Sequence, residues 1–556
     1  MASDQRSVLE TRREQVFPLL APREIERLRR FGEARRYNAG DYLAKAGERS
    51  PGMLLVLSGE LNASQHDALG RDEHIVTHTA GSFSAELSSL SGAPALVNAV
   101  AKTAVEAFVI PPERLREIMV EEAELGERIM RALILRRVGL LETGHSGPVI
   151  VGDRENSKVL GLGDFLRRNG HPHQIFDPAE DYAGRVLLER FDGPQDDLPL
   201  VFCPGGQVLR NPSEDELAKC LGLVNPINLA KLYDVAIVGA GPAGLAAAVY
   251  AASEGLEVLV LDCRAFGGQA GASARIENYL GFPTGITGMA LMGRAYNQAQ
   301  KFGAHLSIPD EAVALREADG HFGLDTSDGD HANARTVVIA TGARYRRPHI
   351  PDLEKYEGSH VHYWASALEA KLCAGEEVAL VGAGNSAGQG AVFLASKVNK
   401  VWLLMRGKDL RQSMSEYLVE RISAQDNIEV LAQTEITGFK GESGKLESVC
   451  WRNNESGEQT ERPIRHVFLF CGAEPNTDWL KSSGLQLDSK GFVCTGIEIE
   501  KNRPALQTSR NGVFAIGDVR SGSIKRVAAA VGEGAQAVAA LHAHLAKLEE
   551  PAGEPP

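Results

Sequence analysis

The spacing of apolar and polar residues changes several times along the chain, which predicts more than one hydrophobic core. Over residues 1–145 a charged helical stretch, PREIERLRRF, is followed by short apolar segments separated by glycine, as in DYLAKAGERSPGMLLVLSGELNA. The region closes on a second helical run, ERLREIMVEEAELGERIMRALILRRVGLL. Short, closely spaced strands with glycine turns predict a small β-barrel or roll between helices, so we expect an α+β module here.

The pattern over residues 146–226 is an alternation of strands and helices. It reads as a strand (PVIVG), a helix (SKVLGLGDFLRRNG), a strand (HQIFD), a helix, a strand (LPLVFCPGG), a short strand (QVLR) and a last helix (SEDELAKCLGL). This alternation predicts a small α/β domain. VNPINLAKL is expected to be the linker that follows, and residues 549–556, the tail EEPAGEPP without its first Glu, are expected to be disordered.

A dinucleotide-binding pattern begins at LYDVAIVGAGPAGLAAAVYAASEGLEVLVLD. An apolar strand runs into Gly239, Gly241 and Gly244, an alanine-rich helix follows, and a second strand ends at Asp262. The first glycine permits the tight turn, the second lets a pyrophosphate approach the backbone, and the third lets helix and strand pack closely. An acid at the end of the second strand accepts ribose hydroxyls and repels a 2′-phosphate, which predicts FAD or NAD.

A second unit repeats the pattern in EEVALVGAGNSAGQGAVFLASKVNKVWLLMRGKDLRQ. Gly382, Gly384 and Ala387 occupy the three small-residue positions, with Asn385 and Ser386 between them. The second strand ends in positive charge rather than in an acid, and positive charge is what a ribose 2′-phosphate requires. The unit therefore predicts an NADPH site that uses the side chains of Arg406, Lys408 and Arg411.

Two further apolar strands end in small-residue turns: VVIATGARYRRP in Ala340-Thr341-Gly342, and NGVFAIGD in Gly517-Asp518. We interpret the first unit and the terminal segment as one dinucleotide-binding domain, residues 227–346 and 477–548, and the second unit as a domain inserted between them, residues 347–476. Two dinucleotides held by one chain imply hydride transfer between them. The predicted cofactors are FAD and NADPH.

Composition and charge exclude several classes of function. Hydrophobic residues make up 43% and charged residues 24% of the chain, and no apolar run approaches the ~20 residues that a membrane helix needs. The net charge of -14 argues against nonspecific binding to nucleic acid or anionic lipid. The start, MASDQRSVLETRREQ, has no apolar signal core, so a cytoplasmic location is expected.

Cysteine and histidine spacing gives no metal motif. The closest two of the seven cysteines are 17 residues apart and no C-x-x-C is present, which favours reduced thiols buried as small hydrophobic residues. Histidines occur in pairs two residues apart, and no third ligand stands nearby in sequence. We therefore expect no metal and interpret the pairs as strand or surface residues: His171 and His173, His360 and His362, His542 and His544.

Residues 231–548 resemble a low-molecular-weight, bacterial-type thioredoxin reductase, a pyridine nucleotide-disulfide reductase fold with two dinucleotide-binding domains. The resemblance is carried by GAGPAG, GGQ, IENYLGFP, ATG, GAGNSA, GAEPNT and GVFAIGD. It implies a homodimer and an FAD site that extends beyond the first turn. The FAD residues so expected are Gly239, Ala240, Gly241, Pro242, Ala243, Gly244, Asp262, Gly268, Gln269, Asn278, Ala340, Thr341, Gly342, Gly517, Asp518, Arg526, Val527 and Ala528.

The chain departs from that family at the redox dithiol. The family's C-x-x-C falls on Trp364, Ala365, Ser366 and Ala367, and the acid after it falls on Leu368. Without a thiolate these positions cannot exchange a disulfide, so the catalytic residues stay unknown. We expect Trp364 to fill space near the flavin. Gly407 replaces one of the family's paired arginines at the NADPH site, and Cys373 is expected to be a packing residue.

The N-terminal region resembles a cyclic nucleotide-binding domain in YNAGDYLAKAGE, LLVLSGEL and GSFSAELSSLSGAPALVNAVA. Glu86 matches the acid that binds the ribose 2′-hydroxyl. Ala85 replaces the family's glycine, and Ala95 replaces the arginine that pairs with the phosphate. Losing that charge-assisted bond costs about 1.5–3 kcal/mol, so cyclic AMP binding is not the expected role, and a structural role for Glu86 stays open.

Residues 146–226 resemble a thioredoxin-like fold, with Leu198-Pro199 in the place of its cis-proline. The redox motif falls on residues 153–157, DRENS, which contain no cysteine. A docking or spacer role is therefore expected.

Three hypotheses follow. In the first, which we favour, an NADPH-dependent FAD oxidoreductase passes electrons to oxygen, a quinone, a small molecule or another redox protein, possibly under control of the N-terminal module. In the second, the chain is a redox- or nucleotide-sensing scaffold with little turnover. In the third, it reduces thioredoxin through distant cysteines.

Overall fold

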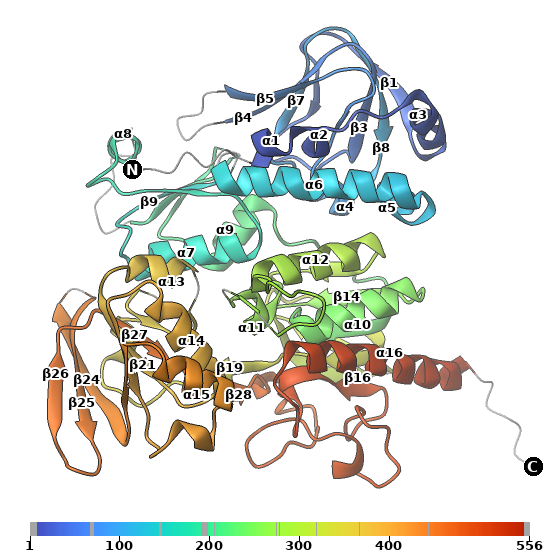
Figure 1. Cartoon of the computed structure of the whole chain (residues 1–556). Helices are drawn as coiled ribbons and strands as arrows, with labels where there is room; N and C mark the ends of the chain where they lie inside the picture. Colours follow the sequence, from blue (N-terminus) through green and yellow to red (C-terminus); the bar gives the residue numbers. More distant parts are fainter. Residues whose placement is uncertain are drawn as a thin grey trace, which may run out of the picture.

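The structure is a computed structural model that describes residues 8–66, 72–143, 147–190, 198–204, 206–273, 275–276, 278–318, 320–357, 359–365, 367–442 and 444–549. Figure 1 shows the N-terminal module (residues 8–143) above α12, a smaller middle module (residues 147–224) beside it, and the two dinucleotide-binding parts below. The predicted tail lies almost wholly outside the described residues.

The N-terminal module is the predicted roll between helices. Two four-stranded antiparallel sheets run in the orders β1-β8-β3-β6 and β2-β7-β4-β5. Their strands are β1 (Glu33–Tyr37), β2 (Tyr42–Ala44), β3 (Met53–Ser58), β4 (Leu61–His66), β5 (Asp72–His78), β6 (Phe83–Ser84), β7 (Asn98–Ala101) and β8 (Val105–Ile110). The helices are α1 (Val8–Thr11), α2 (Arg13–Val16), α3 (Pro22–Leu28), α4 (Ser88–Ser91), α5 (Pro112–Glu121) and α6 (Ala123–Thr143).

The long helical run predicted at the end of this module is two helices. Glu122, between α5 and α6, leaves the helical conformation, and its carboxylate accepts hydrogen bonds from Arg27 and Arg30. Apolar side chains of both helices, including Leu115, Ile118 and Leu133, complete a core with the sheet.

The middle module contains every element that the alternation predicted. Its sheet has the order β10-β9-β11-β12, with β10 parallel and β11 antiparallel to β9, and Leu198–Pro199 is cis immediately before β11. The elements are β9 (Val149–Val151), α7 (Ser157–Arg168), β10 (Gln174–Phe176), α8 (Tyr182–Arg190), β11 (Leu200–Phe202), β12 (Val208–Arg210) and α9 (Glu214–Leu221). The arrangement agrees with the expected thioredoxin-like order.

The expectation that all the cysteines are reduced is wrong at one pair. Cys203, just after β11, and Cys220, in α9, form a disulfide with Cα atoms 6.7 Å apart. Leu217 and Ala218 pack α9 onto the sheet, and this packing brings the two sulfurs together. Sequence spacing did not reveal the pair because the contact arises only from helix packing.

The FAD part is built on one seven-stranded sheet in the order β15-β14-β13-β18-β17-β16, with β29 also paired to β18. Strands β15, β14, β13, β18 and β29 are parallel, whereas β16 and β17 form an antiparallel extension. The strands are β13 (Leu232–Val238), β14 (Val258–Leu261), β15 (His305–Ser307), β16 (Ala312–Ala318), β17 (His321–Thr326), β18 (His331–Ile339) and β29 (Val513–Ala515). The helices are α10 (Pro242–Ser253), α11 (Gly268–Gly271), α12 (Gly288–Lys301) and α16 (Val527–Glu549).

The NADPH part has its own five-stranded parallel sheet, β20-β27-β21-β22-β23, and a three-stranded antiparallel sheet, β24-β25-β26. Its strands are β20 (Val361–His362), β21 (Glu377–Val381), β22 (Lys400–Leu404), β23 (Ile428–Leu431), β24 (Thr434–Glu442), β25 (Lys445–Asn453), β26 (Gln459–Arg462) and β27 (His466–Leu469). The helices are α13 (Ala367–Leu372), α14 (Asn385–Ala395) and α15 (Glu416–Ser423).

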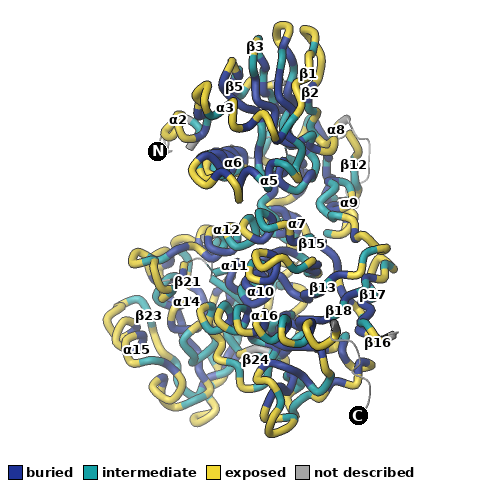
Figure 2. The backbone as a smooth tube through the Cα atoms, turned by 90° about the vertical axis from the view of Figure 1, so that its right-hand side faces the viewer, coloured by how far each residue is buried: buried dark blue, intermediate teal, exposed yellow. Residues whose placement is uncertain are grey.

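The inserted arrangement follows from the strand pairing. Strand β18 precedes the NADPH part in sequence and β29 follows it, yet the two strands lie side by side in one sheet. The two connections between the parts pair as an antiparallel ribbon, β19 (Ala343–Tyr345) with β28 (Ala473–Pro475). In Figure 2 the buried residues concentrate in the sheets and in α10. Among the described residues no helix is both long and apolar enough to cross a bilayer.

Candidate functional site

The first glycine turn, between β13 and α10, has the geometry of a dinucleotide cradle. Gly239 has φ +111°, and a Cβ there would lie 2.2 Å from the carbonyl oxygen of Ala340. A Cβ on Gly244 would lie 1.8 Å from the carbonyl oxygen of Gly239. Beside Gly241, in contrast, the nearest atom to such a Cβ is the Cα of Gly268, 3.9 Å away. The turn is therefore closed where helix and strand pack and open where a pyrophosphate would approach, so these residues fit FAD.

Asp262 lies at the end of β14, next to this turn. Its carboxylate accepts the backbone N–H of Ala240 at 2.8 Å, and those of Arg264 and Ala265 at 3.1 and 3.2 Å. Burial raises the pKa of Asp262, and the three backbone donors oppose that rise. The carboxylate thus fixes the shape of the turn, and its contact with a ribose stays a prediction.

The GGQ segment approaches the same turn from the other side. The backbone N–H of Gly267 donates to the carbonyl oxygen of Ala240 at 2.7 Å, which places Gly268 against Gly241. The side chain of Gln269 donates to the carbonyl oxygen of Ala343 at 3.2 Å. The predicted FAD residues of this segment therefore lie together with the first turn.

The ATG turn is fixed by a residue that sequence reasoning did not single out. Thr341 Oγ1 donates to the carbonyl oxygen of Asn476 at 2.8 Å, and Asn476 Nδ2 donates to that of Thr341 at 2.9 Å. Asn476 also donates its backbone N–H to Gly342. The signal was the motif GAEPNT, which contains this asparagine.

The terminal segment also reaches the cradle. A Cβ on Gly517 would lie 2.9 Å from the Cβ of Ala243 in α10, and the backbone N–H of Gly517 donates to Glu533 Oε2 at 2.6 Å. Glu533, which the sequence did not reveal, also pairs with Arg520 at 2.6 Å. Burial raises the pKa of the half-buried Asp518.

Four predicted FAD residues are not joined to the cradle by such contacts. Asn278 is exposed, beside the bridge between Ile276 and Ile286, and Arg526 is exposed just before α16. The first two residues of that helix are Val527, which is half-buried, and Ala528, which is exposed. Their contact with FAD stays a prediction.

The second turn, between β21 and α14, repeats the division between a closed and an open side. A Cβ on Gly382 would lie 2.8 Å from the carbonyl oxygen of Phe470, whereas a Cβ on Gly384 would meet nothing within 4 Å. Ala387 is buried against the strand. Asn385 Oδ1 accepts the backbone N–H and the hydroxyl of Ser415 at 2.7 and 2.8 Å, which fixes the start of α14. Ser386, the next residue, lies in the first turn of that helix.

The predicted cations of the NADPH site lie just after β22, and all three are exposed. Arg411 pairs with Glu416 at 3.2 Å and lies 3.9 Å from Asp409. Arg406 and Lys408 form no ion pair with any carboxylate of the described residues. These two side chains are the ones that can bind a ribose phosphate without first breaking an ion pair.

The positions of the missing dithiol lie between β20 and α13. Trp364 is half-buried, Ala365 packs against the core of the NADPH part, and Ser366 lies outside the described residues. Ala367 begins α13, and Leu368 follows it. The position of Trp364 relative to the flavin stays a prediction.

Cys373, at the end of α13, is fully buried in the core of the NADPH part. Its Sγ donates to the carbonyl oxygen of Glu369 at 3.0 Å. Burial raises the pKa of the thiol to about 12, so the thiolate is scarce at neutral pH. The predicted packing role is in agreement with this environment.

In the N-terminal module, the acid expected to bind a ribose is already paired. Glu86 is 4% exposed, and its Oε2 accepts Arg137 Nε at 3.0 Å and Nη2 at 2.5 Å. Arg137, from α6, also donates to the carbonyl oxygen of Gly170 in the middle module at 3.1 Å. Its neighbour Arg136 donates to Ala85, and Ala95 is buried. The cassette is therefore held by two arginines of α6.

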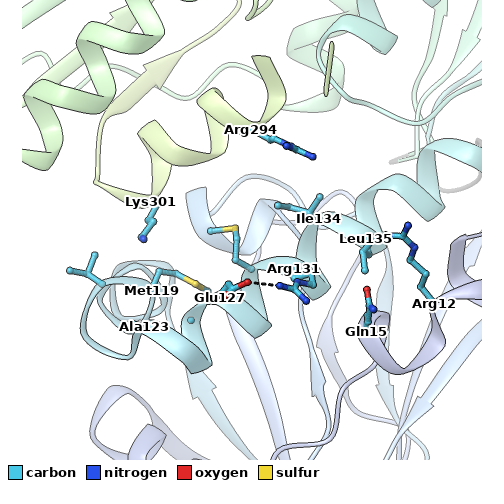
Figure 3. Close-up of a pocket in the computed structure, with 13 residues that line it drawn as sticks. Arg12, Gln15, Met119, Ala123, Glu127, Arg131, Ile134, Leu135, Arg294 and Lys301 are labelled. Carbon is cyan, nitrogen blue, oxygen red and sulfur yellow. Dashed lines mark hydrogen bonds and ion pairs between the residues drawn. The ribbon is translucent and has the colours of Figure 1, made fainter. Parts of the chain in front are cut away.

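Figure 3 shows a cavity of about 630 Å³ between this module and the FAD part. Met119, Met130 and Ile134 line it from α5 and α6, and Arg294 and Lys301 line it from α12. None of its lining residues belongs to either dinucleotide turn. The cavity marks the seam between the two parts rather than the cofactor site.

The fold and the two turns define a class of protein, an oxidoreductase with one FAD-binding and one NADPH-binding domain. The sequence profile of the pyridine nucleotide-disulphide oxidoreductase family matches residues 233–534, more than half of the chain, and the chain belongs to that family. Its nearest named kin are thioredoxin reductases, and the cofactors of this group are FAD and NADPH. The profile of the cyclic nucleotide-binding domain matches residues 34–122.

Individual relatives cover only the C-terminal part. Thioredoxin reductase of Treponema pallidum is 33% identical over 317 residues, which are 57% of this chain and 98% of that protein. The structures of thioredoxin reductase from T. acidophilum and Lactococcus lactis are 31% and 28% identical, each with a TM-score of 0.52. They cover 56% and 57% of this chain, and 98% and 99% of their own. The enzyme is thus thioredoxin reductase-like, with an added N-terminal half.

Proposed function

We propose that this protein is an NADPH-dependent flavoprotein that reduces an acceptor other than an internal dithiol. The observation that carries the proposal is the pair of turns open at Gly241 and Gly384, combined with Trp364 at the first dithiol position. NADPH gives up a hydride, which is two electrons and a proton, and leaves as NADP⁺. The acceptor gains both electrons and takes up protons. Oxygen, a quinone, another small molecule or a redox protein fits this requirement.

Mixing the FAD-loaded protein with NADPH in a stopped-flow instrument tests the first half-reaction. We expect the visible flavin absorbance to bleach anaerobically and to return when an acceptor is added. Oxygen, a soluble quinone and a disulfide protein are the acceptors to compare. A flavin that stays oxidised for minutes in excess NADPH contradicts the proposal, and rapid turnover with the disulfide protein contradicts the non-dithiol acceptor.

The distant cysteines give little support to thioredoxin reduction as an alternative. Burial raises the pKa of Cys263 and of Cys373 to about 12, and disulfide exchange needs a thiolate. Replacing both residues by serine should leave NADPH oxidation unchanged.

A second candidate function is a redox- or nucleotide-responsive scaffold. The observation that favours it is Arg137, which joins Glu86 to the carbonyl oxygen of Gly170 and so connects the N-terminal and middle modules. A ligand that took Glu86 would release this connection. Limited proteolysis with and without NADPH or a cyclic nucleotide tests it, and identical cutting patterns argue for simple turnover.

We further propose a homodimer in the cytoplasm, with no nucleic acid partner. The support is the likeness to thioredoxin reductases, whose members are usually homodimers, and the net charge of -14. Sedimentation equilibrium of the FAD-loaded protein gives the oligomeric state directly.

A further inference from the structure

The middle module docks on the short segment that leads from β14 to the GGQ turn. Arg264 of that segment receives both carboxylate oxygens of Glu214 at 2.8 Å, and its Nη1 lies 3.2 Å from Asp164 of α7. Asn169, just after α7, donates to the carbonyl oxygen of Arg264 at 3.1 Å. Two elements of the middle module therefore grip a segment that borders the FAD turn on both sides, at Asp262 and at Gly268.

Arg168, the last residue of α7, extends from this interface to the turn itself. Its Nη2 donates to the carbonyl oxygen of Gly268 at 2.9 Å, and Gly268 is the residue that faces Gly241. Its Nε is buried and has no hydrogen-bond partner among the described residues. Burial lowers the pKa of Arg168, and the carboxylates of Asp164 and Asp262 oppose that effect. A cation thus lies at the open side of the first turn, with donor capacity left over.

The carboxylates near Arg168 are already engaged. Asp164 and Glu214 pair with Arg264, and the oxygens of Asp262 accept three backbone N–H groups. A buried guanidinium is costly unless an anion neutralises it and its N–H groups are bonded. A diphosphate is such an anion, and guanidinium groups bind phosphate oxygens through two N–H bonds.

We propose that Arg168 of the middle module binds the diphosphate of FAD, so that this module completes the cofactor site of the reductase part. The inference rests on the FAD site proposed above. It gives the middle module a role although its own loop 153–157 has no cysteine: α7 carries a cofactor ligand instead of a redox pair. FAD and the middle module then stabilise each other, because the cofactor is held between residues of two domains.

The test is the dissociation constant of FAD, followed in the full-length protein by flavin fluorescence and not by turnover. We expect Arg168→Met to weaken FAD binding about ten- to hundredfold, the range of a lost charge-assisted phosphate bond. Arg168→Lys should recover part of the affinity because it restores the charge. The wild-type constant should weaken with salt more steeply than that of Arg168→Met.

Two control variants separate binding from docking. Arg185→Met removes an arginine of the same module that donates only to the carbonyl oxygen of Ala179, and FAD affinity should not change. Glu214→Gln weakens the grip on Arg264 without removing the cation, so its effect should stay below that of Arg168→Met. Equal losses in Glu214→Gln and Arg168→Met, with no rescue by lysine, overturn the inference in favour of docking alone.

Hydrogen exchange of the wild-type chain keeps the inference testable if Arg168→Met does not fold. Adding FAD to the apoprotein should slow exchange in α7 and in residues 262–271, and leave α8 unchanged. Unchanged exchange in α7 overturns the inference. A wild-type protein that does not bind FAD at all contradicts the proposed function instead.

Discussion

At the residue scale, the two turns differ in what their strands present to the nucleotide. The first strand pair ends in Asp262, whose carboxylate is held by backbone donors, and the second ends in exposed cations. A fixed acid excludes a 2′-phosphate, whereas mobile cations attract one. This difference, visible in the sequence, is preserved in the fold and predicts which nucleotide each turn accepts.

Removing the two unpaired cations should lower the preference for NADPH. We expect Arg406→Ala/Lys408→Ala to raise the KM for NADPH about ten- to hundredfold, because one or two charge-assisted phosphate bonds of about 1.5–3 kcal/mol each are lost. The KM for NADH should change less than about threefold. Steady-state kinetics with both nucleotides measure this. Arg421→Ala, which removes an exposed arginine of α15, is a surface control, and equal losses for NADPH and NADH contradict the assignment.

At the element scale, the pairing of β20 with β27 buries two imidazoles. His362 Nε2 lies 3.2 Å from His466 Nδ1, and the rings stack with centroids 5.5 Å apart. Burial lowers the pKa of His466 to about 3, and that of His362 also lies well below its usual value. Both groups are therefore neutral in the folded protein at pH 7.

These histidines should make the NADPH part less stable in mild acid. The unfolded chain binds protons at its ordinary pKa near 6.5, whereas the folded chain does not until about pH 3, so stability is present above about 6.5 and falls below it. Each histidine contributes about 1.4 kcal/mol per pH unit in that window. Denaturant unfolding at pH 7 and pH 5 measures the loss. His466→Phe should reduce the slope, while an exposed control, His349→Phe, should not.

Elements were the level at which the sequence predicted most. The alternation over residues 146–226 predicted each strand and helix of the middle module, because periodicity is a local property. The break at Glu122 was missed, since it depends on Arg27 and Arg30 of another helix. The Cys203–Cys220 disulfide, Asn476 and Glu533 were missed for the same reason, as their partners are distant in sequence. The glycine turns were predictable because their sterics lie within a few residues.

At the scale of the whole molecule, α6 connects three parts. Its Arg137 contacts Glu86 of the roll and Gly170 of the middle module, and its apolar residues face α12 of the FAD part across the cavity of Figure 3. A largely buried ion pair between modules is costly to break, because the remaining charge is left without a partner. The connection is therefore a sensitive point of the assembly.

Replacing Arg137 by leucine should destabilise the N-terminal module selectively. We expect a loss of about 3–5 kcal/mol, the usual effect of removing one partner of a buried ion pair. Far-UV circular dichroism should show a separate early transition in denaturant, while flavin release keeps its wild-type midpoint. Arg131→Leu, which breaks an exposed pair with Glu127 on the same helix, should cost less than about 1 kcal/mol. Similar effects of both variants would show that the inter-module contact is unimportant.

The pairing of β18 with β29 also determines the order in which a growing chain can mature. Val337 and Val513 are neighbours in the sheet, so a nascent chain on the ribosome must emerge almost to its end before that sheet is complete. The inserted NADPH sheet closes within residues 361–469 and is able to form while synthesis continues. Premature termination anywhere before residue 513 would thus release a polypeptide with a finished pyridine-nucleotide fold beside an unfinished flavin fold.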